Sequence, residues 1–236
     1  LADVAEGQNM STETRLQCAS IGKLITAVAA LQLVEKELIT LDEPVNPHLK
    51  GWKVPDNALT EKQPVTLRHL LSHSAGLTDE YGFSGYMPGK PLPTLVQALS
   101  GQKPAITTKK LEIKHLPGTR EQYSGGGYLI VQLLIQSLSG MPFADYVQAH
   151  IFDVLGMRHS SYHKEPEVSN IAYASAHDRK GKTLKGSYRV FPEQAAAGPW
   201  TTAADLCRLL TGMQESYQGK ATQLLGQELM QECMTR

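Results

Sequence analysis

The chain has 236 residues, and at about 150 residues per domain this length allows one large domain or two small ones. Hydrophobic residues make up 41% and charged residues 19%, with 20 glycines and 13 prolines, which is ordinary globular usage and excludes a collagenous, low-complexity or disordered chain. Lysine plus arginine and aspartate plus glutamate both number 23, so the formal net charge is zero and no global field attracts nucleic acid or an acidic membrane surface.

Neither the start of the chain nor its cysteines reveal a compartment. The sequence begins at Leu1 without an initiating methionine, a basic leader or a signal-type apolar segment, so we expect its natural start to have been removed. Cys18, Cys207 and Cys233 are an odd number without CxxC spacing and predict neither a disulfide framework nor a zinc site. The localisation is therefore unknown, and both a periplasmic or secreted and a cytoplasmic location stay open.

The clearest predicted helix runs from Ser20 to about Glu37. Its apolar residues recur at helical spacing and form one stripe, made of Ile21, Leu24, Ile25, Val28, Leu31 and Val34. The longest nearly apolar run in the chain, Leu24 to Val34, lies in this helix and is well short of the roughly 20 residues needed to cross a bilayer. The sequence thus predicts a soluble chain with no transmembrane segment.

Shorter helices alternate with loops in the next part of the chain. Prolines interrupt the pattern after the first helix and predict a loop region that extends to Gln63. A helix follows at Thr66 to Ser72, and another is predicted near Leu95 to Ser100. Between them, Asp79 to Pro93 is rich in glycine, proline, tyrosine and serine and is predicted to form a long surface loop, a feature that is unusual unless it is functional.

The second half of the chain is also predicted to be mainly helical. Helices are predicted at Gly126–Ser139, with Gly140 as its C-terminal cap, at Phe143–Ile151 and at Thr202 to about Glu215. Ser160 to Pro192 has no helical stripe and is predicted to hold two short strands around Lys180-Gly181. Alternating strand patterns are otherwise scarce.

The residues with the clearest chemical potential are Ser20 and Lys23, which form an S-x-x-K motif at the start of the first helix. Their spacing places the hydroxyl and the ammonium on one helix face, where a desolvated lysine helps to remove the proton from the serine. The spacing alone is a weak signal, because Ser100 and Ser161 also begin S-x-x-K sequences. Only Ser20 opens a long apolar helix, and a simple helix-capping role is the alternative for it.

Segments in a fixed order carry a family resemblance: CASIGKLITAVAALQLVEKELITLDEPV at 18–45, VTLRHLLSHSAGL at 65–77, PGTREQYSGGGYLIVQLLIQSLSGMPFADYVQAHIFDVLGM at 117–157 and PEQAAAGPWTTAADLCRLL at 192–210. They resemble the serine β-lactamase-related family, which includes class C β-lactamases, D-Ala-D-Ala carboxypeptidases, D-aminopeptidases and esterases. The resemblance spans nearly the whole chain. It implies an α+β, β-lactamase/transpeptidase-like fold, with residues 1–236 forming mainly the helical part of a single domain.

The resemblance also implies roles for individual residues. Ser20 would be the acylated nucleophile, Lys23 its proton-transfer partner and Tyr123 the tyrosine of the second motif, normally Tyr-x-Asn. A lysine ammonium beside a phenol stabilises the phenolate, so Tyr123 is suited to act as a base; a half-buried structural tyrosine is the alternative. Gly125 stands where the family has asparagine, in a substrate-binding position. This change favours esters or peptides over β-lactams.

The third family motif, a lysine or histidine followed by x-Gly, does not occur in this sequence. In the family its strand belongs to the central antiparallel sheet and supplies one backbone N–H of the oxyanion hole. Loss of one such donor typically costs about 10²–10³ in rate. Only 19 residues precede Ser20, so we expect the sheet to be largely missing from this chain, which would be truncated at both ends.

Other candidate residues have weaker patterns. Tyr86 and Trp200 are candidates to line the substrate cleft, although single aromatic residues more often belong to the core or the rim. His69 and His73 are four residues apart, as in a zinc pair, but the segment lacks the glutamate of HExxH, so no metal site is predicted. The chain also has no G-x-S-x-G elbow, and we expect no cofactor.

The sequence supports a serine hydrolase that forms an acyl-enzyme, with ester, D-amino-acid peptide and β-lactam substrates in that order of preference. Its partner would be a small-molecule or peptide acyl substrate, with no nucleic acid; the oligomeric state stays open. The absent third motif and Gly125 favour one alternative, a catalytically impaired binding or regulatory module. An acyltransferase that uses the same residues is a further alternative.

Overall fold

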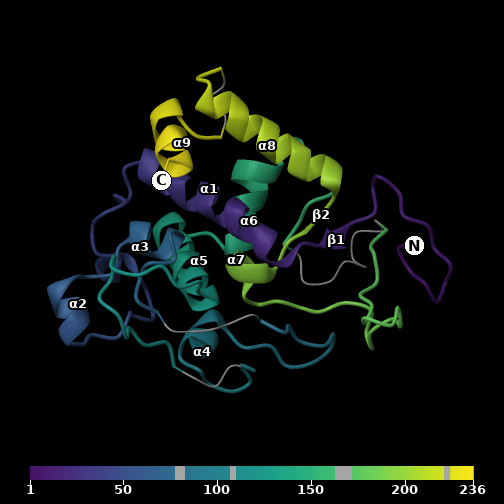
Figure 1. Ribbon diagram of the computed structural model, residues 1–236, viewed down its shortest axis with the longest axis horizontal. Helices are drawn as coiled ribbons and strands as arrows, with labels where there is room; N and C mark the ends of the chain where they lie inside the picture. Colours follow the sequence, from purple (N-terminus) through teal and green to yellow (C-terminus); the bar gives the residue numbers. More distant parts are fainter. Residues whose placement is uncertain (78–82, 107–109, 163–171, 221–223, 236) are drawn as a thin grey trace.

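The computed structural model describes residues 1–77, 83–106, 110–162, 172–220 and 224–235 (Figure 1). Two long helices, α1 (Gly22–Glu35) and α5 (Gly125–Ser139), pack against each other and against the short helix α7 (Gln194–Ala197). Helix α3 (Leu67–Leu71) packs on α5. The main hydrophobic core lies between these helices.

The first helix is more central than its predicted stripe implied. Residues on nearly every face of α1 are buried, including Ile25, Ala29 and Leu33. Ile21, which was assigned to the apolar stripe, is 50% exposed because it precedes the helix in the 3₁₀ turn η1 (Ala19–Ile21). Figure 1 shows why α1 is covered all round: α8 and α9 lie on one side of it, and α3, α5 and α7 on the other.

The remaining helical elements surround this centre and are η2 (Asn46–His48), α2 (Ala58–Lys62), α4 (Leu95–Leu99), α6 (Phe143–Val147), the π-helical turn η3 (Gln148–Phe152), α8 (Ala203–Tyr217) and α9 (Gln227–Met234). Several begin and end where the sequence predicts. The hydroxyls of Thr66 and Thr202 accept hydrogen bonds from the first turns of α3 and α8. Gly140 ends α5 at φ +71°, a left-handed conformation that glycine adopts without strain.

Other expectations from the sequence are corrected by the structure. The single helix predicted at Phe143–Ile151 is divided into α6 and η3. The two strands predicted around Lys180-Gly181 are not formed in the described residues, where His177 and Thr183 make only an isolated bridge. Helices α2, α7 and α9 were not predicted. Part of the loop predicted at Asp79–Pro93 lies outside the described residues.

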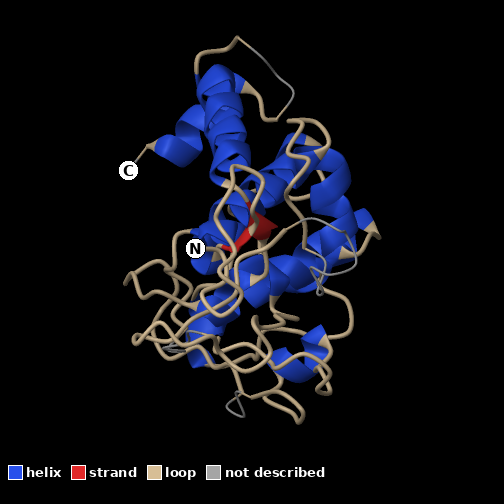
Figure 2. Cartoon of the chain, turned by 90° about the vertical axis from the view of Figure 1, so that its right-hand side faces the viewer, coloured by secondary structure: helices blue, strands red, loops and turns tan. Residues whose placement is uncertain are grey.

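A two-stranded antiparallel sheet joins the start of the chain to its last third. Its strands are β1 (Leu16–Gln17) and β2 (Trp200–Thr201), with Leu16 opposite Thr201 (Figure 2). The Cys18 N–H continues the pairing by donating to the Pro199 carbonyl at 3.1 Å. The sheet is therefore small in the described part of the chain, as the sequence predicts, and it fixes the residues just before Ser20 beside α7.

In the described residues, no individual helix has both the length and the apolar character needed to cross a membrane. Helix α5 meets these criteria only together with the helical segment Phe143–Phe152, from which it is bent by 76°.

Helix α7 is held in the core by a side-chain clamp from α5. The amide of Gln132, which is 3% exposed, donates from Nε2 to the Pro192 carbonyl at 3.3 Å and accepts the Ala195 N–H on Oε1 at 3.0 Å. From α1, the Thr26 hydroxyl donates to the Ala195 carbonyl at 2.9 Å. Backbone groups in the interior need such partners, so Gln132 and Thr26 together fix where this turn lies.

Replacement of this clamp tests its contribution to stability. Gln132→Leu leaves the buried Pro192 carbonyl and Ala195 N–H without their amide partners, so we expect a loss of about 1–3 kcal/mol in the free energy of unfolding, measured by urea denaturation. Gln136→Leu, one turn further along α5 at a half-buried position, is the matched control and should change stability by less than about 0.5 kcal/mol. Equal effects of both substitutions would contradict the clamp.

Candidate active site

The structure brings together the three residues that the sequence nominates for chemistry. The Ser20 hydroxyl oxygen lies 2.8 Å from the Tyr123 hydroxyl and 3.2 Å from Lys23 Nζ. Ser20 lies in η1, Lys23 in the first turn of α1, and Tyr123 just before α5. Ser20 and Tyr123 are exposed, whereas Lys23 is only 8% exposed. A hydroxyl open to solvent thus lies against a buried cation.

Close packing of the backbone sets this arrangement. A Cβ atom at Gly22 would lie 2.6 Å from Cγ of Pro199, nearer than two carbon atoms pack. A glycine is therefore needed between Ser20 and Lys23 for the turn to approach the segment before β2. Thr26 and Lys23, on the same side of α1, then reach the carbonyls of Ala195 and Ala196.

The Lys23 ammonium is held by oxygens and aromatic rings. It donates to the Ala196 carbonyl at 2.7 Å and to Ser20 Oγ at 3.2 Å. It also lies 5.0 Å from the ring centre of Tyr123 and 5.4 Å from that of Tyr128, within the range of cation–π attraction. No carboxylate of the described residues forms a salt bridge with it. Its positive charge therefore acts on Ser20 and Tyr123.

The two tyrosines beside Lys23 have opposite pKa shifts. Burial tends to raise the pKa of Tyr123, but its hydrogen bonds with Lys23 and Ser20 and the charge of Lys23 outweigh this effect and lower the pKa below the ordinary tyrosine value. Burial, and secondarily the proximity of Tyr123, raises the pKa of Tyr128 to about 12. Two neighbouring groups whose pKa values are shifted in opposite directions take different protonation roles. Tyr123 is the phenol that ionises more readily.

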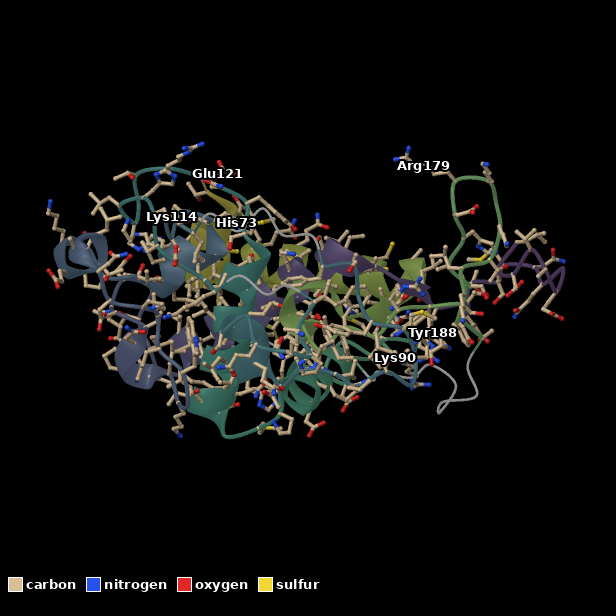
Figure 3. The ribbon with its side chains drawn as sticks, turned by 90° about the horizontal axis from the view of Figure 1, so that it is seen from below. His73, Lys90, Lys114, Glu121, Arg179 and Tyr188 are labelled. Carbon is tan, nitrogen blue, oxygen red and sulfur yellow. The ribbon has the colours of Figure 1, made fainter. Side chains whose placement is uncertain are left out.

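His73 also belongs to this site. Its sequence pattern, four residues after His69, suggests only a metal ligand and does not indicate this place. It lies just after α3 rather than on it, so it does not form a helical pair with His69. Its ring centre is 4.5 Å from that of Tyr123 and 5.2 Å from that of Tyr128. The available signal was its place in the segment 65–77 that carries the family resemblance. Figure 3 shows His73 and Glu121 at the same end of the molecule.

The residues predicted to bind substrate lie in different environments. Gly125 is buried at the start of α5, two residues from Tyr123, and its contact with substrate stays a prediction. Trp200 is 1% exposed and packs edge-to-face against Tyr173 and Tyr188, so its side chain belongs to an interior aromatic cluster and not to the cleft wall. Tyr86 is 6% exposed, and its hydroxyl accepts the Ile106 N–H at 2.9 Å. Its side chain is therefore buried within the loop, and its contact with substrate stays a prediction.

Glu193 is an unusual buried acid next to α7. It is 3% exposed, and its Oε1 accepts the Tyr86 hydroxyl at 3.4 Å. Burial raises its pKa to about 7 from the usual 4.5, although hydrogen bonds from its own N–H and from Tyr86 act in the opposite direction. The folded protein therefore retains a proton on Glu193 at pH values where the unfolded chain has lost it.

The linkage between Glu193 and stability has a definite sign. Between about pH 4.5 and pH 7 the folded state binds more protons than the unfolded state, so this residue makes stability fall as the pH rises. Glu193→Gln removes that dependence, and its stability relative to the natural protein should increase by on the order of 2–3 kcal/mol from pH 4 to pH 8. Urea denaturation at both pH values measures this. Glu215→Gln, at an exposed position of α8, is the control. A pH-dependent gain for Glu193→Gln no larger than that of Glu215→Gln would rule out a raised pKa for Glu193.

Comparison with known proteins identifies the family to which this chain is similar. The family model described as Beta-lactamase matches residues 1–235. The teichoic acid D-alanine hydrolase of Staphylococcus aureus is 25% identical over 214 residues, which cover 90% of this chain and 49% of that protein. Penicillin-binding protein 4* of Bacillus subtilis is 27% identical over 188 residues, which cover 77% of this chain and 39% of that protein.

A solved structure gives the same result for the fold. The penicillin-binding protein from Bacillus halodurans superimposes with a TM-score of 0.75 at 27% identity, covering 100% of this chain and 68% of that one. The predicted β-lactamase/transpeptidase-like fold is thereby confirmed. The chain spans 34% to 49% of the length of the first curated relatives that it matches.

Proposed function

Because the chain belongs to the beta-lactamase family, we propose that it is a serine hydrolase that forms an acyl-enzyme on Ser20. One observation carries the proposal: a solvent-exposed serine hydroxyl lies within hydrogen-bond distance of both a phenol and a buried ammonium. A nucleophile beside a base that is itself oriented by a third group is the arrangement that activates a serine. Ser20 and Lys23 share one segment, and Tyr123 lies 103 positions from Ser20 in the sequence.

Tyr123 is the base in this proposal. Once the phenol is ionised, the 2.8 Å contact reverses and the Ser20 hydroxyl donates to the phenolate. The Lys23 ammonium stabilises the phenolate by its charge, and its bond to the Ala196 carbonyl holds it in place. Attack of Ser20 Oγ on a carbonyl carbon then transfers the serine proton to Tyr123.

The remaining steps return the site to its starting state. The bond between the carbonyl carbon and the leaving group breaks, and Tyr123 gives its proton to the departing oxygen or nitrogen. Water then attacks the acyl carbon, its proton passes to Tyr123, and Ser20 leaves with that proton as the acid is released. The positive end of the α1 helix adjoins Ser20 and favours the negative charge that develops there.

We rank esters ahead of D-amino-acid peptides, and both ahead of β-lactams, as substrates. Gly125 offers no side-chain amide to a substrate where the family pattern has asparagine. An ester has a better leaving group than an amide, so it is the substrate least dependent on that contact. The S. aureus relative is named a teichoic acid D-alanine hydrolase, and esters of D-amino acids are accordingly the first to assay.

The absence of a Lys-x-Gly or His-x-Gly motif favours one alternative function. A family member without a complete oxyanion hole would bind acyl ligands in this cleft and turn them over slowly or not at all. Saturable ligand binding that is unchanged in Ser20→Ala, together with no turnover, distinguishes this module from the hydrolase.

Covalent labelling tests the nucleophile directly. A fluorophosphonate should label the natural protein once, and a chromogenic ester should be hydrolysed; Ser20→Ala should lose both reactions because no other hydroxyl occupies this position. Ser100→Ala is the matched control, because Ser100 also begins an S-x-x-K sequence but lies at the end of α4. Labelling that persists in Ser20→Ala would exclude this mechanism.

The pH dependence of labelling tests the base. The rate should rise with pH along a limb whose apparent pKa lies below the ordinary tyrosine value of about 10, since the lowered pKa of Tyr123 sets it. Tyr123→Phe should abolish this limb and slow labelling by about 10²-fold or more. Tyr217→Phe, at an exposed tyrosine of α8, should leave the limb where it is. A limb that survives in Tyr123→Phe would assign the base elsewhere.

A further inference from the structure

His73 makes contact with Tyr123 from several directions. Its Nδ1 accepts the Ser124 N–H at 3.1 Å, and its backbone carbonyl accepts the Gln122 N–H at 2.8 Å. The residues on both sides of Tyr123 are therefore tied to one histidine. The ring itself lies against the Tyr123 ring, with centres 4.5 Å apart and planes inclined by 37°. Backbone and side chain of the tyrosine are thus located by the same residue.

The backbone at His73 has an uncommon conformation. Its φ is +57°, in the left-handed region that residues other than glycine rarely occupy. Such a conformation costs free energy and persists only where the surroundings determine it. Here it turns the chain after α3 so that the carbonyl meets Gln122 while the ring meets Tyr123 and Tyr128. The strain is located at the residue that contacts the proposed base.

Burial, together with the charge of Lys23, favours the neutral form of the His73 ring. The groups that face it are Lys23 from α1, Tyr128 from α5, Tyr123 from the segment before α5, and Glu121. Burial and the positive charge of Lys23 lower its pKa, and Glu121 opposes them. A neutral ring leaves Nδ1 free to accept the Ser124 N–H, and it adds no second cation beside Lys23.

We propose that His73 is a positioning residue for Tyr123, whose ring holds the phenol beside Lys23 and Ser20. This inference rests on the proposed function, because it assigns His73 to the step in which Tyr123 removes the serine proton. Tyr123 is 50% exposed, so its ring is only partly packed. Among the described residues, the His73 ring supplies part of that packing. Without it the phenol samples other rotamers, and the 2.8 Å contact with Ser20 is made less often.

His73→Asn separates the ring from the other contributions of this residue. Asparagine tolerates positive φ, and its side-chain oxygen can accept the Ser124 N–H in place of Nδ1. The variant therefore loses chiefly the ring. We expect fluorophosphonate labelling of Ser20 to slow about tenfold at neutral pH. The pH limb should move upward by about one unit, because a phenol that spends less time beside Lys23 has a pKa nearer to that of free tyrosine. KM for a chromogenic ester should change less than kcat.

His69→Asn is the matched control, four residues earlier in the same segment. His69 is half-buried, and its Nδ1 accepts the Thr66 N–H at the start of α3, away from Tyr123. The His69→Asn variant should have the labelling rate and the pH limb of the natural protein. Urea denaturation of each variant establishes that the comparison is made on folded protein.

The outcomes separate this inference from the proposed function. If the natural protein is not labelled at Ser20, the hydrolase proposal fails before His73 is in question. If it is labelled and His73→Asn has the same rate and the same pH limb, the positioning role is overturned. A slower His73→Asn whose limb has not moved would mean that the His73 ring does not act through Tyr123, and this also overturns the positioning role.

Discussion

The buried ammonium of Lys23 is the group on which the rest of the site depends. A cation at this depth needs compensation, and in the described residues it obtains this from the Ala196 carbonyl, the Ser20 hydroxyl and two aromatic rings instead of a carboxylate. Its hydrogen bond and its charge help to lower the pKa of Tyr123, and its charge adds to the larger effect of burial in lowering the pKa of His73. The ammonium therefore acts on both neighbours.

The helical core determines where this ammonium lies. Gln132 on α5 and Thr26 on α1 hold α7 between the two long helices, and α7 presents the Ala196 carbonyl to Lys23. The pairing of β1 with β2 and the close approach at Gly22 bring Ser20 to the same place. Ser20 and Tyr123 lie on exposed backbone that precedes α1 and α5 respectively, so reactive groups are accessible while their supports are buried.

Much of the helical framework follows from the sequence because local signals specify it. Apolar periodicity locates α1 and α5, threonine caps begin α3 and α8, and Gly140 ends α5. The predictions fail where tertiary contacts override these signals. Helix α7 is a single turn held by Gln132 and Thr26, which no local pattern indicates. Tyr86 and Trp200 are interior because distant segments cover them, a fact that a lone aromatic residue in a sequence does not reveal.

From the sequence alone, the S-x-x-K spacing at the start of the first helix and the order of the motifs nominated Ser20 and Lys23. The same order of motifs nominated Tyr123. Only the tertiary structure decided that Tyr123 reaches Ser20, that Tyr128 stays a neutral phenol beside the same ammonium, and that His73 contacts the first of them. The physical reason is distance along the chain: contacts between α1, the end of α3 and the start of α5 arise from packing and from burial, and neither is encoded in any short stretch of residues.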